Sequence, residues 1–122
     1  MSKSLLVIED NPDNQCLVTW ILEDGGYDVT CADTAEAGLD LLEQASYDCV
    51  LMDISLPGID GKEATRRIRE NEQWRDLPVI ALTAHAIKGE TADIFASGVN
   101  DLITKPVDEE KLLACLKALI HH

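Results

Sequence analysis

Three carboxylates, one hydroxyl and one lysine stand directly after short apolar runs of this 122-residue sequence. Each run has the length of a strand buried on both faces, so each polar group is expected at the tip of a strand. The central example is Asp53, which follows four apolar residues and precedes a loop that contains proline and glycine. The complete set is Glu9, Asp10, Asp53, Thr83 and Lys105.

Gathered in one place, these five side chains have the chemistry of a phosphoryl-acceptor site. Three neighbouring carboxylates repel one another, and the pKa of at least one should rise unless a cation lies between them. Mg²⁺ is the expected cation, because it prefers oxygen ligands and is commonly bound by one or two carboxylates plus a phosphate. The metal and Lys105 would neutralise phosphoryl oxygens while Asp53 acts as nucleophile. The product would be an aspartyl phosphate, whose oxygens would attract Thr83 and Lys105.

Apolar runs alternate with amphipathic segments along the chain, which predicts an α/β domain with a parallel sheet covered on both faces. The carboxyl ends of parallel strands meet at one edge of the sheet, so the five polar residues should lie together there. Strands are expected over residues 4–8, 27–32, 49–52, 78–84 and 101–104. Helices are expected after the N-caps Asp13, Thr34, Asp60 and Asp108, with a weaker helical pattern over residues 85–97.

Composition and charge exclude several classes of function. No apolar run approaches the roughly 20 residues of a membrane-spanning helix, and the N-terminus lacks the apolar core of a secretory signal. A net charge of −13 repels nucleic-acid phosphates and anionic lipids. We therefore expect a cytoplasmic protein that contacts neither nucleic acid nor membrane. Its four cysteines are widely spaced and are expected as reduced core residues, and Trp20 is expected to pack the first helix onto the sheet.

Four segments, VIEDN, VLMDISLPGIDG, IALTA and ITKPV, occur in the order seen in receiver domains of two-component response regulators. The chain resembles this family from its first strand to its last helix, so we expect one receiver domain over residues 1–122 and no effector domain. The resemblance implies a flavodoxin-like (βα)5 fold with strand order 2-1-3-4-5. It also implies Asp53 as phosphoacceptor, Asp10 as a direct Mg²⁺ ligand, Glu9 as a ligand through water, and the Ser55 backbone carbonyl as a further ligand.

The same resemblance implies that Thr83 and Lys105 contact the phosphate and that Pro106 follows a cis peptide bond. The donor would be a histidine kinase or a histidine phosphotransfer protein, and the output would be a changed interaction with a downstream protein. Such a domain assists its own phosphorylation and dephosphorylation without being a conventional enzyme. The segment LTAHA, with His85, is most similar to receivers of hybrid sensor kinases and phosphorelays. Leu102 stands where receivers often have an aromatic switch residue, so the route from phosphate to surface differs from that pattern.

Three alternatives are weighed against this hypothesis. Haloacid-dehalogenase-like phosphatases also combine an aspartate nucleophile with Mg²⁺, but they need an acid two residues later, where this chain has Ser55. A flavodoxin would bind the phosphate of FMN in its first loop, which the acidic segment EDNPDN would repel. A pseudo-receiver would bind partners without being phosphorylated, and the complete set of site residues argues against it.

Overall fold

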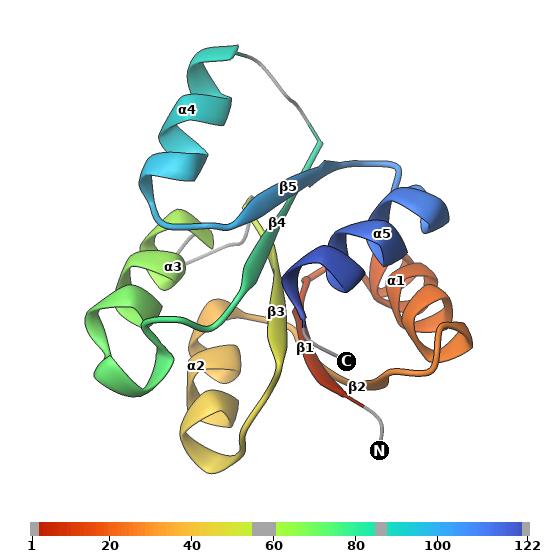
Figure 1. Cartoon of the computed structure of the whole chain (residues 1–122), viewed down its shortest axis with the longest axis horizontal. Coiled ribbons are helices and arrows are strands. Elements are labelled where there is room, and N and C mark those ends of the chain that lie inside the picture. The colour runs from red at the N-terminus through yellow and green to blue at the C-terminus, as the bar shows by residue number, and fades with distance from the viewer. Residues whose placement is uncertain (1–2, 55–60, 85–87, 121–122) are drawn as a thin grey trace.

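The computed structural model describes residues 3–54, 61–84 and 88–120 of the chain. Five parallel strands form one sheet in the order β2-β1-β3-β4-β5, with helices on both faces (Figure 1). The expected α/β fold and strand order are therefore confirmed. In chain order the elements are β1 (Ser4–Ile8), α1 (Pro12–Asp24), β2 (Asp28–Ala32), α2 (Ala35–Gln44), β3 (Cys49–Asp53), α3 (Gly61–Glu70), the 3-10 helix η1 (Glu72–Trp74), β4 (Val79–Thr83), α4 (Lys88–Ala96), β5 (Asp101–Thr104) and α5 (Glu109–Leu119).

The sheet is buried on both faces because successive residues of a strand point to opposite sides. In β1, Leu5 and Val7 pack into the core layer beneath α1 and α5, whereas Leu6 and Ile8 pack into the layer beneath α2, α3 and α4. All five residues of the central strand β3 are buried. A strand in this position has no solvent-facing side, which explains its unbroken apolar run.

The register of the strands brings the carboxyl ends of β1, β3 and β4 to the same edge of the sheet. Ile8 of β1 pairs with Met52 of β3, and Asp53 of β3 pairs with Leu82 of β4. Residues that follow these pairs in the chain therefore leave the sheet side by side. This alignment decides where the polar residues predicted at strand ends are found.

Helix α1 begins earlier than expected, because its N-cap is Asn11 and not Asp13. The Asn11 side chain accepts hydrogen bonds from the backbone N–H groups of Asp13 and Asn14, at 2.9 and 3.1 Å. Pro12 occupies the first helical turn. Backbone N–H groups in this turn have no partner within the helix, so the N–H that proline lacks costs no hydrogen bond. An asparagine followed by proline thus marks the start of this helix.

The other helix starts agree with the sequence where the structure describes them. Thr34 accepts a hydrogen bond from the Ala37 N–H at 3.1 Å and caps α2. Asp108 accepts one from the Lys111 N–H at 3.0 Å and caps α5. The expected cap of α3, Asp60, lies outside the described residues.

Two expectations about the core are wrong. Trp20 is 61% exposed instead of packing on the sheet. Cys16 and Cys31 are also exposed, whereas Cys49 and Cys115 are buried as expected. For α1 the reason is the helical period, since its buried stripe points away from residues 16 and 20. That stripe consists of Val18, Ile21 and Leu22.

Arg69 of α3 is half-buried and bonds to loops that are distant from α3 in the sequence. Its guanidinium donates hydrogen bonds to the carbonyls of Gly98 and Leu77, at 2.9 and 2.6 Å, and to Asn100 Oδ1 at 2.7 Å. Burial lowers the pKa of this guanidinium. The planar guanidinium, with its N–H donors in a fixed geometry, thereby joins α3 to the loops that precede β4 and β5.

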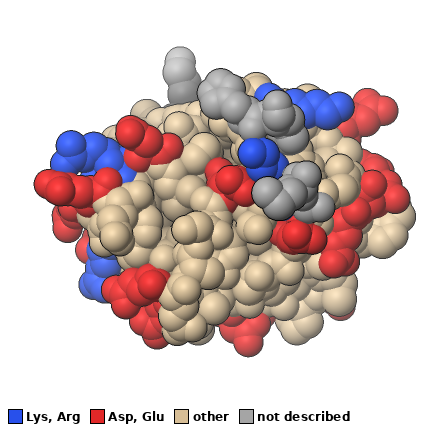
Figure 2. All heavy atoms as spheres, turned by 60° about the horizontal axis from the view of Figure 1, so that its bottom comes forward, with Lys and Arg blue, Asp and Glu red and all other residues tan. Residues whose placement is uncertain are grey.

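The surface is mainly acidic, as expected from 23 acidic and 10 basic residues. On the face shown in Figure 2, acidic side chains are widespread and the basic ones stand apart from one another. Within the described part of the chain, no helix is both long enough and apolar enough to span a bilayer.

Candidate functional site

Three carboxylates meet at the carboxyl edge of the sheet, as the sequence predicts. One oxygen from each of Glu9, Asp10 and Asp53 lies within 4.8 Å of the other two. Glu9 and Asp53 are buried, with relative exposures of 0% and 2%, whereas Asp10 is exposed. The cluster therefore has a buried floor and one acid open to solvent.

The ammonium group of Lys105 contacts both buried acids. Its Nζ is 2.9 Å from Glu9 Oε2 and 3.3 Å from Asp53 Oδ2. The backbone positions this side chain, because the Lys105 N–H donates to the Thr83 carbonyl at 2.7 Å. The peptide bond from Lys105 to Pro106 is cis, as the family resemblance implies. Thr83 is buried at the end of β4, between the strand that bears Asp53 and the strand that leads to Lys105.

Burial dominates the electrostatics of Glu9. Removal from solvent is the largest cause of its raised pKa, and Asp53 raises the pKa further, while Lys105 and the Asn11 N–H offset part of the shift. Glu9 Oε1 accepts the Asn11 N–H at 3.2 Å. Among the described residues, Glu9 Oε2 accepts no well-aligned hydrogen bond despite the nearby ammonium. Such an oxygen is available to a cation or to a water molecule bound to one.

The pKa of Lys105 is raised as well, but for a lysine this shift favours the charged form. Burial by itself lowers the pKa of an ammonium group, but the contacts with Glu9 and Asp53 outweigh it, and the net shift is upward. Lys105 therefore stays charged at neutral pH and supplies a fixed positive charge beside Asp53. The sequence predicts this positive charge, but not its simultaneous contact with two acids.

The raised pKa of Glu9 should make the metal-free protein less stable as pH rises. The folded state binds a proton at Glu9 more tightly than the unfolded state does. This contribution is therefore fully present below the ordinary pKa of 4.5 and is lost as pH rises through the raised pKa. Glu9→Gln removes the titration. The free energy of unfolding of Glu9→Gln, relative to that of wild type, should therefore increase with pH. The increase should be about 1.4 kcal/mol for each unit by which the pKa of Glu9 is raised.

Urea unfolding in EDTA, from pH 4.5 to neutrality, checks this expectation. Glu110→Gln, at an exposed position in the first turn of α5, is the matched control and should follow the wild-type pH profile. Parallel profiles for wild type and Glu9→Gln would contradict the assignment of a raised pKa to Glu9.

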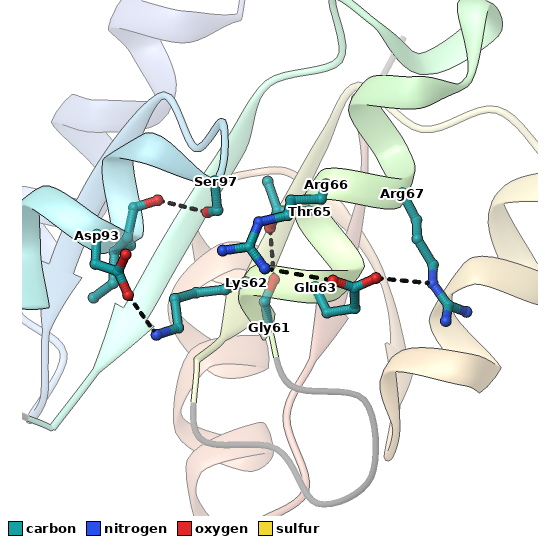
Figure 3. Close-up of polar contacts among 9 residues, drawn as sticks. Gly61, Lys62, Glu63, Thr65, Arg66, Arg67, Asp93 and Ser97 are labelled. Atoms are coloured by element: carbon teal, nitrogen blue, oxygen red, sulfur yellow. Dashed lines mark hydrogen bonds and ion pairs between the residues drawn. The ribbon is translucent and has the colours of Figure 1, made fainter.

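The first turn of α3 is held close behind Asp53. A side chain at Gly61 would overlap the Asp53 carbonyl oxygen, so only glycine fits where the helix begins. The Thr65 hydroxyl donates to the Gly61 carbonyl at 2.7 Å, and Lys62 Nζ lies 2.9 Å from Asp93 Oδ2 of α4 (Figure 3). The first contact stabilises the start of α3, and the second joins α3 to α4.

Sequence reasoning missed one residue that supports the cluster. Gln15 of α1 donates from Nε2 to the Glu9 carbonyl and to Asp33 Oδ1, the latter at 2.7 Å. It thereby ties the start of α1 to the loops after β1 and β2. No signal in the sequence distinguishes Gln15 from an ordinary helical glutamine.

The structure brings most of the predicted site residues together and places Leu102 elsewhere. Leu102 is half-buried and packs against the core layer of α2, α3 and α4, away from the carboxylates. Ser55 and His85 lie outside the described residues, so the expected carbonyl ligand and the histidine of LTAHA stay predictions.

Comparison with known proteins identifies the family. Residues 5–117 match the model of the response regulator receiver domain. Over 88% of its length the chain is 41% identical to the sensor protein GacS of Pseudomonas syringae pv. syringae, but it spans only 12% of the length of GacS. It is 34% identical to the polar-differentiation response regulator DivK of Brucella suis, and the alignment covers 98% of both proteins.

A solved structure supports the same family. The receiver domain of the sensor histidine kinase PA1611 from Pseudomonas aeruginosa PAO1 has a magnesium ion coordinated in its active site cleft. The present chain superimposes on it with a TM-score of 0.91, with 37% identity over 98% of both chains. None of these comparisons favours the phosphatase alternative. The chain belongs to the response regulator receiver domain family of two-component and phosphorelay signalling proteins.

Proposed function

We propose that Asp53 accepts a phosphoryl group from a phosphohistidine and that the modified domain changes its interactions with a downstream protein. The observation that carries this proposal is the placement of Asp53 in a cluster of three carboxylates, with Lys105 Nζ 3.3 Å from its Oδ2. A nucleophile, a fixed cation and a group of oxygen ligands are the parts that phosphoryl transfer needs.

The transfer exchanges one bond to phosphorus for another. A carboxylate oxygen of Asp53 forms the new O–P bond as the N–P bond to the donor imidazole breaks, and the donor nitrogen keeps the electron pair. Lys105 balances negative charge on the phosphoryl oxygens. The Thr83 hydroxyl, at the end of the adjacent strand, would contact the product after a local adjustment, which would give the domain a phosphate-dependent change.

The residues present fit a magnesium ion. The donors are hard carboxylate oxygens, and the buried Glu9 Oε2 lacks a well-aligned hydrogen bond from the described residues. Asp10 and Asp53 would bind the ion directly, Glu9 through water, and the carbonyl of Ser55 would be a further ligand. When bound, the ion supplies positive charge next to the incoming phosphoryl group. The magnesium ion in the PA1611 receiver supports this assignment.

The proposed partners are a histidine kinase or histidine phosphotransfer protein as donor and a protein as target. The matches to a sensor protein and to a response regulator support the donor class. The net charge of −13 supports a cytoplasmic role without nucleic-acid or membrane contact. In this role the chain is a signalling phosphoacceptor and not a conventional enzyme.

Phosphorylation by a small-molecule donor tests the proposal. Incubation with phosphoramidate and millimolar MgCl2 should add the mass of one phosphoryl group to the intact protein, and tandem mass spectrometry should locate it at Asp53. Excess EDTA should suppress the adduct, because Asp53 then lacks the metal charge. Absence of any adduct with phosphoramidate and with acetyl phosphate would contradict the proposal and favour a phosphorylation-independent role.

A further inference from the structure

A groove runs between α2 and the segment formed by α3 and η1, which lie side by side on one face of the sheet (Figure 1). It consists of two hollows of about 450 and 360 Å³ that share Glu43 and Trp74 as lining residues. Each hollow has the size of a pocket that binds a side chain or a small ligand. None of the described residues that line it belongs to the carboxylate cluster.

The floor of the groove is apolar and aromatic. Leu42 is buried there, and Tyr47, Trp74 and Leu77 are half-buried, each packed on the core with part of its surface open to the groove. Trp74 lies at the junction of the two hollows. The face of an indole ring attracts a cation, and a guanidinium can stack on it.

The α2 wall of the groove is acidic. Glu36, Asp40 and Glu43 are spaced four and three residues apart, so they share one flank of the helix, and all three line the groove. Like charges at this spacing destabilise a helix. Among the described residues, neither Asp40 nor Glu43 is in an ion pair. The only described cation that lines the groove is Arg67, whose Nε is 3.6 Å from Glu63 on its own helix.

The geometry points to a docking site for an arginine-bearing segment of a protein partner. An arginine side chain entering the groove would lay its planar guanidinium on Trp74 and donate paired hydrogen bonds to the carboxylates of α2. Its aliphatic stem would cover Leu42 and Tyr47. Charge complementarity selects this occupant, because an acidic wall beside an aromatic floor matches a cation with an apolar stem. The inference is independent of phosphorylation at Asp53.

Fluorescence titration tests the inference in the intact chain. Trp20→Phe, at an exposed position, leaves Trp74 as the only tryptophan and hence as a reporter within the groove. The probe is a blocked pentapeptide with two arginines flanking a leucine, and the control peptide has neutral citrulline at both positions. The arginine peptide should change Trp74 emission saturably, and the citrulline peptide should bind at least about tenfold more weakly.

Matched charge variants separate the groove from the general acidity of the protein. E36Q/D40N/E43Q should weaken the arginine peptide at least about tenfold, since all three carboxylates line the groove. E23Q/D24N/E110Q removes the same number of charges from exposed positions outside the groove and should weaken it less than about threefold. Circular dichroism confirms that each variant is folded. Equal losses in the two variants, or no saturable change at Trp74, would overturn the inference.

A second copy of the chain is the competing occupant. If Trp74 emission changes with protein concentration in the absence of peptide, and sedimentation shows a dimer, the groove joins copies of the chain and the inference is wrong. The same titration with Asp53→Asn should give the wild-type affinity, so failure of the phosphoacceptor role and failure of this docking site are distinguishable.

Discussion

Replacing Asp53 with asparagine should reduce the phosphoryl adduct formed from phosphoramidate and Mg²⁺ to below about 1% of the wild-type level. An amide lacks the anionic oxygen that attacks phosphorus, while its size and shape are nearly those of the carboxylate. The variant should also fold at least as stably as wild type in the absence of metal. It removes one of two buried negative charges, and Lys105 remains paired with Glu9 at 2.9 Å.

Asp28→Asn is the matched control for this experiment. Asp28 is exposed at the start of β2, the opposite end of the sheet from the cluster, and the same chemical change there should leave the adduct unaltered. Intact-protein mass spectrometry gives the amount of adduct, and thermal unfolding in EDTA gives the stability. An undiminished adduct on Asp53→Asn would show that another acid of the cluster, with the exposed Asp10 the first candidate, accepts the phosphoryl group.

Lys105→Gln should lower the free energy of unfolding of the metal-free protein at neutral pH by about 1–3 kcal/mol. The ammonium group contacts both buried carboxylates, so its loss leaves Glu9 and Asp53 facing each other without a compensating charge. Further protonation of Glu9, whose pKa is already raised, limits the loss. The same substitution should slow phosphorylation, because the fixed cation beside Asp53 is lost.

Magnesium distinguishes this effect from a general loss of packing. Urea unfolding with EDTA and with millimolar MgCl2 should show a smaller difference between Lys105→Gln and wild type when the metal is present, since the ion replaces part of the missing charge. Lys111→Gln, at an exposed position on α5, should behave as wild type in both conditions. A loss of stability that magnesium leaves unchanged would contradict the electrostatic role of Lys105.

The sequence identifies only part of the reason why the pKa of Glu9 is raised. Repulsion among three acids predicts that one pKa rises, and the pKa of Glu9 does rise. In the structure, however, burial is the largest cause and repulsion from Asp53 is secondary. A sequence shows that acids follow neighbouring strands, but the depth at which each side chain sits depends on the helices and loops that close over the edge.

The location of the site could be predicted because it depends on the parallel direction of the strands. Residues 9, 53 and 83 directly follow or end strands whose apolar runs are unmistakable, and adjacent parallel strands must end at one edge. The caps at Thr34 and Asp108 were equally predictable, since a capping side chain bonds to N–H groups within three residues. Local rules and an unbroken apolar pattern therefore suffice for the α/β class and for the edge that carries the site, whereas the strand order 2-1-3-4-5 followed from the family resemblance.

Local rules could not predict contacts between segments that are distant in the sequence. Arg69 binds three loop positions that only the folded chain brings near α3, and the groove at Trp74 exists because α2 packs beside α3 and η1. Trp20 stays in solvent because the helical period turns it away from the sheet. The sequence by itself determined the α/β class, the edge of the sheet at which the candidate site lies and the residues that meet there. Only the tertiary structure decided their burial, their ion pairs and the surfaces left open, because these depend on side-chain packing between elements far apart in the chain.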